Sequence, residues 1–507
     1  MARAEQCSPA IERDRSTGQR CLPALPPPGY HRRRPETTDL YEALRLHLST
    51  WLEALDGAGD ELPAHVRAEV DRFLACGVLA HGFVRVRCPR CRDDLVVAYS
   101  CKGRGFCPSC GGRQMADRAA RWVDSLLPAV AWRQWVLTLP WQLRLRAAWR
   151  PTVVTTVLNR FVASVRVELR RELRRRGVRG GELAAVTAVQ RFGSALNLNV
   201  HLHVLVADGL WVEGRHGVHP RFVPVRVTDA TVERVVARTW RSVERWLLRE
   251  GLVEPDRFDE DTDPEDATQL KLWHASANLS AATGERAGKP IRRERAPRPA
   301  RPRHEPATRR RRPLHARFGG FDLHAARRVG RDDRTALERL CRYLLRPPLA
   351  VRRLTRLDDG RYRYALKAPW SDGTTALLLE PFELIERLVA LVPPPKANLV
   401  RYHGVLAPNH RWRRAISPPR RADGRSWHRP ELPAADKPRV PWAELLRRTF
   451  LIDVLRCERC GARRKVLWPA VPPGPIAREL LAHLGLDAAP PELAPARGPP
   501  WEESWAS

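Results

Sequence analysis

The sequence lacks the long apolar segments that a membrane protein needs. None of its 507 residues belongs to a run of 18 apolar side chains, and its N-terminal stretch has no apolar core of the kind found in export signals. Methionine occurs only twice, whereas arginine is abundant, as in GC-rich coding. We therefore expect a soluble, unexported, cytoplasmic protein with no membrane partner.

Acidic residues are also in short supply. Asp and Glu number 57 against 89 Lys and Arg, which leaves a net charge of +32 and a pI near 11.0. An ordinary metabolic enzyme does not carry such a surplus, and it favours a polyanionic partner, DNA or RNA before a membrane. We expect a nucleoid-associated protein, with a homo-oligomer left open. The hydrophobic content of 43% indicates globular folding, and the length suits two to four compact units.

One stretch, residues 195–211, alternates between apolar and polar side chains. Its polar positions carry two carboxamides and two imidazoles, and this period of two predicts a strand with one buried face. Two neutral imidazoles on neighbouring same-face positions can share one divalent cation, so His201 and His203 are candidate metal ligands. The alternative is a solvated sheet surface. Asp208 and Gly209 predict a hairpin turn into a second strand.

The surrounding segments predict an α+β fold. A strand over 133–141, a helix over 151–176, a strand over 184–190 and a helix capped at Thr228 or Asp229 form an antiparallel sheet with flanking helices. The tryptophans of this region are expected in the core, with base stacking as the alternative; they are Trp135, Trp141, Trp211, Trp240 and Trp246. We expect these parts: a disordered arm 1–36, a helical lead and zinc ribbon 37–125, a first sheet part 126–252, a disordered acidic and basic linker 253–316, a second sheet part 317–400, and a basic C-terminal region 401–507.

Two Cys-x-x-Cys pairs near the N-terminus are the most specific metal-binding signal. Cys88, Cys91, Cys107 and Cys110 supply the four thiolates of a tetrahedral, structural Zn²⁺ site. Cys101 lies between the two pairs and could replace one ligand, which leaves the ligand set open.

The remaining cysteines give weaker signals. Cys457 and Cys460 could form half of a second zinc site, which needs partners such as His483 from elsewhere in the chain. The alternative is that the pair occurs by chance and binds no metal. Cys76 stands alone in the sequence, so a core position is the simplest expectation for it.

Basic residues near these motifs are candidates for DNA contact. Arginine and lysine side chains bind phosphate oxygens, although a solvated basic surface explains them equally in a chain this rich in arginine. The candidates are Arg85, Arg87, Lys102 and Arg104 in the ribbon, Arg342 and Arg346 in a helix, and Arg401 in a basic loop over 401–409.

Tyr343 is the candidate phosphoryl acceptor. It flanks the apolar stripe of a helix that begins near Asp332 or Asp333 and ends before Pro347. A rim position in the core is the plain alternative. Tyr362 and Tyr364, in a predicted strand, are competing candidates.

Four motifs in this order resemble the insertion-sequence-91 rolling-circle transposases, which belong to the His-hydrophobe-His (HUH) endonucleases. The resemblance covers about residues 40–250 and 318–465. The motifs are the Cys-x-x-Cys pair with Ser-Cys-Lys-Gly-Arg-Gly-Phe-Cys-Pro-Ser-Cys, then Gln190 to His203, then Leu340-Cys-Arg-Tyr-Leu-Leu-Arg-Pro-Pro, then Arg401-Tyr-His-Gly-Val-Leu-Ala-Pro-Asn.

The resemblance implies strand transfer of single-stranded DNA at the element ends and target, through a 5′-phosphotyrosine intermediate. It makes His201 and His203 the ligands of Mg²⁺ or Mn²⁺ and Tyr343 the nucleophile. Gln190 is our choice for a third ligand, with Asn199 and His324 as rivals. Relatives with a second tyrosine four residues away exist, but Arg339 and Pro347 occupy those positions here.

Two other functions are weighed against this one. A replication initiator or relaxase would share the histidine face but not the two-pair cysteine ribbon. A non-enzymatic zinc-ribbon protein that binds nucleic acid would leave the histidine pair without a role.

Overall fold

The computed structural model describes residues 33–214, 219–252, 264–296, 312–418, 443, 453–467 and 469–497. These residues form two compact units. The smaller unit consists of Leu79–Tyr99 and the described part of Lys437–Ala488. The larger unit contains Arg34–Val78, most of Ser100–Asp436 and the residues after Ala489.

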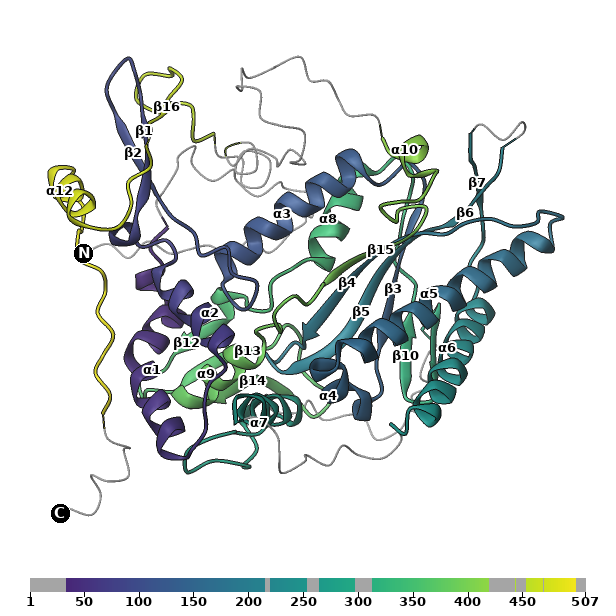
Figure 1. Ribbon diagram of the computed structural model, residues 1–507, viewed down its shortest axis with the longest axis horizontal. Coiled ribbons are helices and arrows are strands. Elements are labelled where there is room, and N and C mark those ends of the chain that lie inside the picture. Colours follow the sequence, from purple (N-terminus) through teal and green to yellow (C-terminus); the bar gives the residue numbers. More distant parts are fainter. Residues whose placement is uncertain are drawn as a thin grey trace, which may run out of the picture. The chain divides into compact units, whose positions relative to one another are not determined.

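An antiparallel sheet forms the centre of the larger unit (Figure 1). The strand that carries the histidine pair, β5, lies in its interior between β4 and β3, and its strand order is β15-β4-β5-β3-β10-β9, with β11 also paired to β3. The bounds are β3 Trp132–Thr138, β4 Ala184–Phe192, β5 Leu198–Ala207, β9 His315–Phe318, β10 Phe321–His324, β11 Arg328–Val329 and β15 Val400–Gly404. The predicted α+β class with an antiparallel sheet is confirmed.

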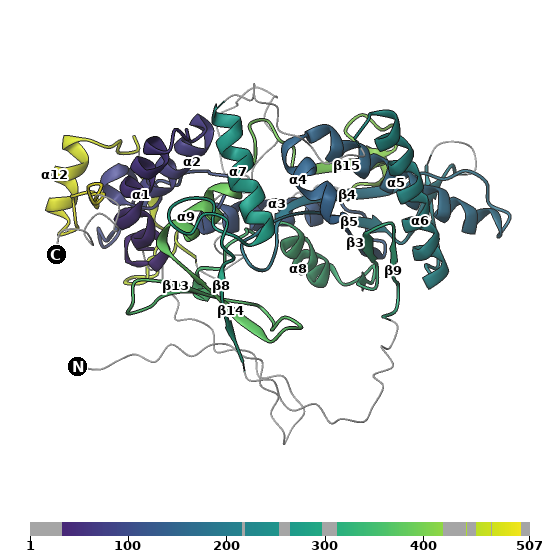
Figure 2. The same ribbon diagram turned by 90° about the horizontal axis from the view of Figure 1, so that it is seen from below.

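Helices cover both faces of this sheet, so β5 is buried on both sides. One face packs Leu202 and Val204 against α4 and α5, while the other packs Leu205 against α3 and α8. Figure 2 shows α4 and α5 on one side of β4 and β5, and α8 on the other. The helices are α3 Pro108–Ser125, α4 Trp141–Trp149, α5 Pro151–Arg174, α6 Asp229–Arg249, α8 Arg334–Leu344 and α10 Arg413–Ile416.

A second antiparallel sheet, of order β12-β13-β14-β8, lies in the same unit with three helices around it. Its strands are β8 Arg292–Arg295, β12 Leu354–Arg356, β13 Tyr362–Ala365 and β14 Thr374–Leu379, and the helices are α1 Asp39–Gly57, α7 Pro264–Asn278 and α9 Pro381–Ala390. Helix α2, Ala64–Ala75, follows α1.

Two of these elements fall in the segment expected to be a linker. Helix α7 buries Leu270, Leu272 and Trp273, and β8 pairs with β14. The expectation of a disordered linker over 253–316 therefore fails for residues 264–296, because these apolar residues pack against α9 and α4. It also fails at residues 315 and 316, which begin β9. Residues 253–263 and 297–311 of the predicted linker, like the arm before residue 33, lie outside the described residues.

The hairpin turn predicted at Asp208 and Gly209 is wrong. Strand β5 does not form a hairpin with the next strand, because β6, Gly209–Val212, pairs with β7, Arg221–Pro224, and bridges to Glu182. Asp208 instead accepts hydrogen bonds from Arg133 and Arg328, and Gly209 lies so close to the Val223 carbonyl that a Cβ would fall 2.3 Å from it.

The predicted basic loop at 401–409 begins as the edge strand β15, paired to β4. An edge strand has only one neighbouring strand, and its apolar and polar side chains alternate weakly, so the sequence did not predict this strand. The predicted cap of α6 is confirmed, since Thr228 accepts from the Thr231 amide in a capping box.

The smaller unit holds β1, Phe83–Arg87, β2, Asp94–Ala98, β16, Lys465–Val466, and helix α12, Pro475–His483. Strand β1 pairs with both β2 and β16, although β16 lies far along the chain. Phe83 and Val96 pack with Leu481 in its small core. Within the part of the chain that the structure describes, no helix has the length and apolar character to cross a bilayer.

Candidate active site and metal centres

The two histidines of β5 lie side by side on the sheet face covered by α3 and α8. Their Nε2 atoms are 3.1 Å apart, and both side chains are buried. The period of two places them on one face, and burial follows because helices cover that face. The solvated-surface alternative is therefore wrong for this face.

A chain of hydrogen bonds fixes the protons on both rings. Nδ1 of His201 donates to the Asn199 carbonyl at 2.9 Å, so its Nε2 is an acceptor. The amide nitrogen of Gln134 lies 2.8 Å from Nδ1 of His203 and donates to it. His203 then carries its proton on Nε2 and donates it to His201.

Both imidazoles are held in the neutral form. Burial lowers the pKa of His201 to about 4, with smaller contributions from the charges of Arg346 and Arg144. Burial also holds the pKa of His203 well below its usual value, and His201 and Arg346 add to this shift. Neutral imidazole is the form that binds a metal ion, so no protonation competes with a cation at neutral pH.

Gln190 lies on the neighbouring strand directly opposite His201. Its amide nitrogen donates to the carbonyl of Leu344 at 2.7 Å, and its Oε1 is buried with no hydrogen-bond partner among the described residues. A buried acceptor without a donor is costly, and a cation beside it removes that cost. The donor set of two imidazole nitrogens and one amide oxygen suits a divalent ion.

The two rival third ligands differ in position. Asn199 shares the face of His201 and also has a buried, unpartnered Oδ1 in the described structure. His324 lies on β10, in register with Val136, which is in turn in register with His203. His324 is thus two strands away from His203, roughly 10 Å at the usual strand spacing.

Tyr343 reaches the histidine pair from the last turn of α8. Its ring meets the ring of His203 edge to face, with centroids 5.7 Å apart. The competing tyrosines lie in the second sheet, where Tyr362 and Tyr364 are fully buried. Burial raises the pKa of Tyr362 to about 12, and Tyr364 is hydrogen-bonded to Arg353. Of these three tyrosines, Tyr343 is the one in ring contact with a histidine of the pair.

Three cations surround the Tyr343 ring. The guanidinium carbon of Arg346 lies 4.6 Å from its centroid, the ammonium nitrogen of Lys367 5.6 Å, and the guanidinium carbon of Arg327 5.9 Å. Together they provide an electropositive place for a phosphate. Arg346 was predicted for DNA contact; Lys367 and Arg327 were missed, because they come from loops that only the fold brings to the tyrosine.

The other basic residues predicted for DNA contact lie away from Tyr343 or are already paired. Carboxylates engage three of them, and carbonyl or hydroxyl oxygens engage two more. Arg85 and Arg87 pair with Asp94, Arg342 pairs with Glu338, Arg104 donates to the Ala397 carbonyl, Arg401 donates to Thr155, and Lys102 is exposed.

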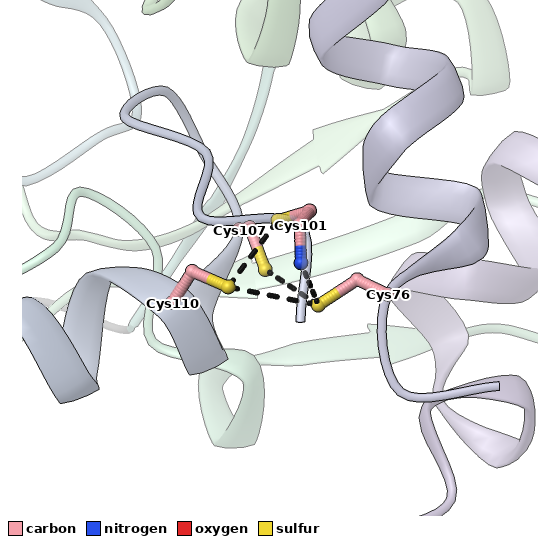
Figure 3. Close-up of side chains that lie close together, drawn as sticks. All are labelled: Cys76, Cys101, Cys107 and Cys110. Carbon is pink, nitrogen blue, oxygen red and sulfur yellow. Dashed lines mark hydrogen bonds between the residues drawn. The ribbon is translucent and has the colours of Figure 1, made fainter. Parts of the chain in front are cut away.

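Four cysteine sulfurs meet between α2 and the start of α3. Cys76, Cys101, Cys107 and Cys110 point toward one another (Figure 3), with all four Sγ atoms within 4.8 Å. Three of the sulfur pairs are 3.3 to 3.7 Å apart. A tetrahedron with Zn–S bonds of about 2.3 Å has edges of about 3.8 Å, so the residues fit a Zn²⁺ ion.

The loop that carries Cys101 is shaped by close contacts. A Cβ on Gly103 would lie 2.4 Å from the Glu69 carboxylate, and the amide of Gly105 donates to that carboxylate at 2.7 Å. The amides of Cys101 and Gly103 point at the sulfurs of Cys76 and Cys101, both at 3.3 Å. The glycines therefore let the loop approach Glu69 and turn its amides toward the thiolates.

The structure divides the predicted cysteines between two clusters. Cys107 and Cys110 do not meet Cys88 and Cys91, so the expected four-ligand set needs correction. Cys76, expected to be a plain core residue, completes the first cluster with Cys101, and the partners of Cys457 and Cys460 are Cys88 and Cys91 rather than His483. Sequence spacing favoured neighbouring pairs, whereas strand β2 separates the two pairs in the fold.

Two protein-family models match segments of this chain. A model of a transposase matches residues 184–414, which include the histidine pair and Tyr343. A model of a transposase zinc-binding domain matches residues 44–139, which include the first cysteine cluster. Neither a curated protein nor a solved structure matches.

Proposed function

Because the chain belongs to the insertion-sequence-91 family of transposases, with a zinc-binding domain ahead of its central sheet, we propose that it cuts and rejoins single-stranded DNA through a covalent tyrosine intermediate. The observation that carries the proposal is the ring contact between Tyr343 and His203, 5.7 Å between centroids, beside a neutral histidine pair. DNA is the partner that the family implies, and the charge of +32 suits it.

Tyr343 acts as the nucleophile in this proposal. Its phenol oxygen forms a bond to phosphorus as the bond from phosphorus to the 3′ oxygen breaks. The phenol loses its proton and the departing 3′ oxygen gains one, so the products are a 5′-phosphotyrosine and a free 3′-OH. The ester bond is exchanged rather than hydrolysed, so a 3′-OH can attack it later and rejoin the strands without a nucleotide cofactor.

His201, His203 and Gln190 are the residues that would hold Mg²⁺ or Mn²⁺. When bound, such an ion polarises a phosphate oxygen and stabilises the charge of the transition state. The residues themselves contribute buried, neutral side chains, so binding needs no net loss of a proton, only a shift of the His203 proton from Nε2 to Nδ1. The orphaned Oε1 of Gln190 supports its role over a purely structural one.

Arg346, Lys367 and Arg327 bind the scissile phosphate in this proposal. Their charges lie within 6 Å of the centroid of the Tyr343 ring, which supports a role in attracting the scissile phosphate to this tyrosine. These residues orient the phosphate and stabilise its charge.

The test uses purified full-length protein, Mn²⁺ and a labelled single strand spanning an element end, analysed on a denaturing gel. We expect a protein-linked DNA band in the wild type that disappears with chelator, in Tyr343→Phe and in His201→Ala. Double-stranded DNA of the same sequence should give no band. Tight DNA binding without a band would contradict the proposal and favour a zinc-ribbon DNA-binding protein.

The DNA around the gene separates a transposase from a replication initiator. Conserved terminal sequences that the protein cleaves in trans would support transposition. Cleavage only at an origin on its own replicon would support initiation.

A further inference from the structure

The second cysteine cluster joins two segments that lie at opposite ends of the chain. The sulfurs of Cys88 and Cys460 are 3.4 Å apart, those of Cys91 and Cys457 are 3.5 Å apart, and all four lie within 4.8 Å. These distances are close to the edge of a tetrahedron with Zn–S bonds of about 2.3 Å. All four residues belong to the smaller unit.

The two Cys-x-x-Cys turns share one backbone conformation. In the first, the Cys88 amide donates to the Asp93 carbonyl, and the Arg92 amide donates back to the Cys88 carbonyl. In the second, the Cys457 amide donates to Ala462, and the Gly461 amide donates back to Cys457.

The residue after each second cysteine has a left-handed conformation. The φ of Arg92 is +58° and the φ of Gly461 is +71°. This conformation is unfavourable for arginine, so its recurrence at matched positions indicates a geometry that the site requires. Two matched turns that face each other present four sulfurs to one centre.

One basic and one acidic side chain lie beside the cluster. Four thiolates around Zn²⁺ carry a net charge of −2. Arg464 lies beside the second turn, nearly buried, where it pairs with Asp93 and donates to the Arg456 carbonyl at 3.2 Å. The Asp93 carboxylate also lies 3.8 Å from the Cys457 sulfur, so this ion pair adds no net charge beside the cluster and instead ties the first turn to the second.

Cys457 and Cys460 lie outside both matched segments, which end at residues 139 and 414. We propose that Cys88, Cys91, Cys457 and Cys460 bind a second structural zinc ion that joins the N-terminal ribbon to the C-terminal segment. Binding exchanges four thiol protons for one Zn²⁺, with no change of oxidation state. A closed shell of four thiolates leaves no open position for chemistry.

Zinc binding assembles the smaller unit. Strand β1 pairs with β16 next to the cluster, with Val86 opposite Val466, and Phe83 exchanges backbone hydrogen bonds with Val471. More than 360 residues separate the two turns, so closing them costs chain entropy that the metal bonds offset. Loss of the ion should therefore loosen β1 as well as the C-terminal turn.

The first measurement is metal content of the full chain, purified under reducing conditions, by elemental mass spectrometry. We expect two zinc ions per chain in the wild type and one in Cys457→Ser/Cys460→Ser. Cys107→Ser/Cys110→Ser should also keep one, and Cys341→Ser, which changes a described cysteine outside both clusters, should keep two. One zinc in the wild type, two in Cys457→Ser/Cys460→Ser, or iron in place of zinc would each overturn the proposal.

Hydrogen exchange separates metal binding from general misfolding. In Cys457→Ser/Cys460→Ser we expect amide exchange over residues 83–98 to rise at least several-fold, while α5 and β5 keep their protection. Cys107→Ser/Cys110→Ser should leave residues 83–98 protected. Unchanged exchange over 83–98 in the first variant would contradict the assembly role.

Discussion

The ring of Tyr343 meets the ring of His203 edge to face, although helices α6 and α7 and several strands lie between the two residues in the described chain. The contact forms because α8 packs Leu340 and Leu344 on the same sheet face that carries the histidines. Gln190 strengthens the link, since its amide donates to the Leu344 carbonyl at the end of α8. The metal-ligand candidates and the nucleophile candidate are therefore parts of one packed layer.

Removing Oε1 of Gln190 should weaken Mn²⁺ binding. We expect His201→Ala to abolish measurable binding and Gln190→Ala to lower affinity, because the latter removes one oxygen donor and keeps both imidazoles. Isothermal titration calorimetry with Mn²⁺ measures this. Asn199→Ala is the matched comparison, and a larger loss there than in Gln190→Ala would assign the third ligand to Asn199.

Gln134 should control the tautomer of His203. A metal ion on Nε2 of His203 requires its proton to move to Nδ1, where the carbonyl oxygen of a turned Gln134 amide would accept it. We expect Gln134→Leu to lower Mn²⁺ affinity about 10- to 100-fold, the usual cost of such a partner. Gln134→Glu should preserve binding, and equal losses in both variants would point to packing instead.

The free energy of unfolding of the metal-free protein should fall as the pH falls from about 6.5 to about 4. His201 has a pKa of about 4 in the folded state. Below about pH 6.5 this imidazole therefore takes up a proton in the unfolded chain but stays neutral in the folded chain. The loss is on the order of 3 kcal/mol by the pKa difference. Urea unfolding of wild type and His201→Gln across this range isolates the effect, and parallel profiles would refute it.

Trp141 should stack on a base of the bound single-stranded DNA. It was expected in the core but is 59% exposed, and it opens α4 just after Thr138, which lies opposite His201. We expect Trp141→Ala to weaken single-strand binding by about 1–3 kcal/mol, roughly 5- to 150-fold. Fluorescence anisotropy measures it. Leu248→Ala, an equally exposed apolar residue on α6, should bind as the wild type does.

Local patterns predicted the elements around the site well. The alternation of residues 195–207 predicted β5 and the shared face of His201 and His203, and the Thr228 cap predicted the start of α6. These features depend on residues that are close together in the sequence, so the sequence pattern alone predicts them.

Features that depend on distant segments were missed. The grouping of eight cysteines into two clusters depends on strand β16 returning to β1, and no spacing rule reports that pairing. Helix α7 was hidden because its apolar residues lie between an acidic and an arginine-rich stretch. Trp141 shows the converse, since an apolar residue in helical register was assigned to the core but lies at the edge.

The most direct test of the account identifies the residue that becomes joined to DNA. Trypsin should release the peptide Tyr343–Arg352, since the Arg346–Pro347 bond resists cleavage, and this peptide holds no other tyrosine. After reaction with Mn²⁺ and a single strand, mass spectrometry should find the DNA on this peptide in the wild type and on none in Tyr343→Phe. DNA on a peptide carrying Tyr362, Tyr364 or Tyr402, or an adduct that persists in Tyr343→Phe, would contradict the account.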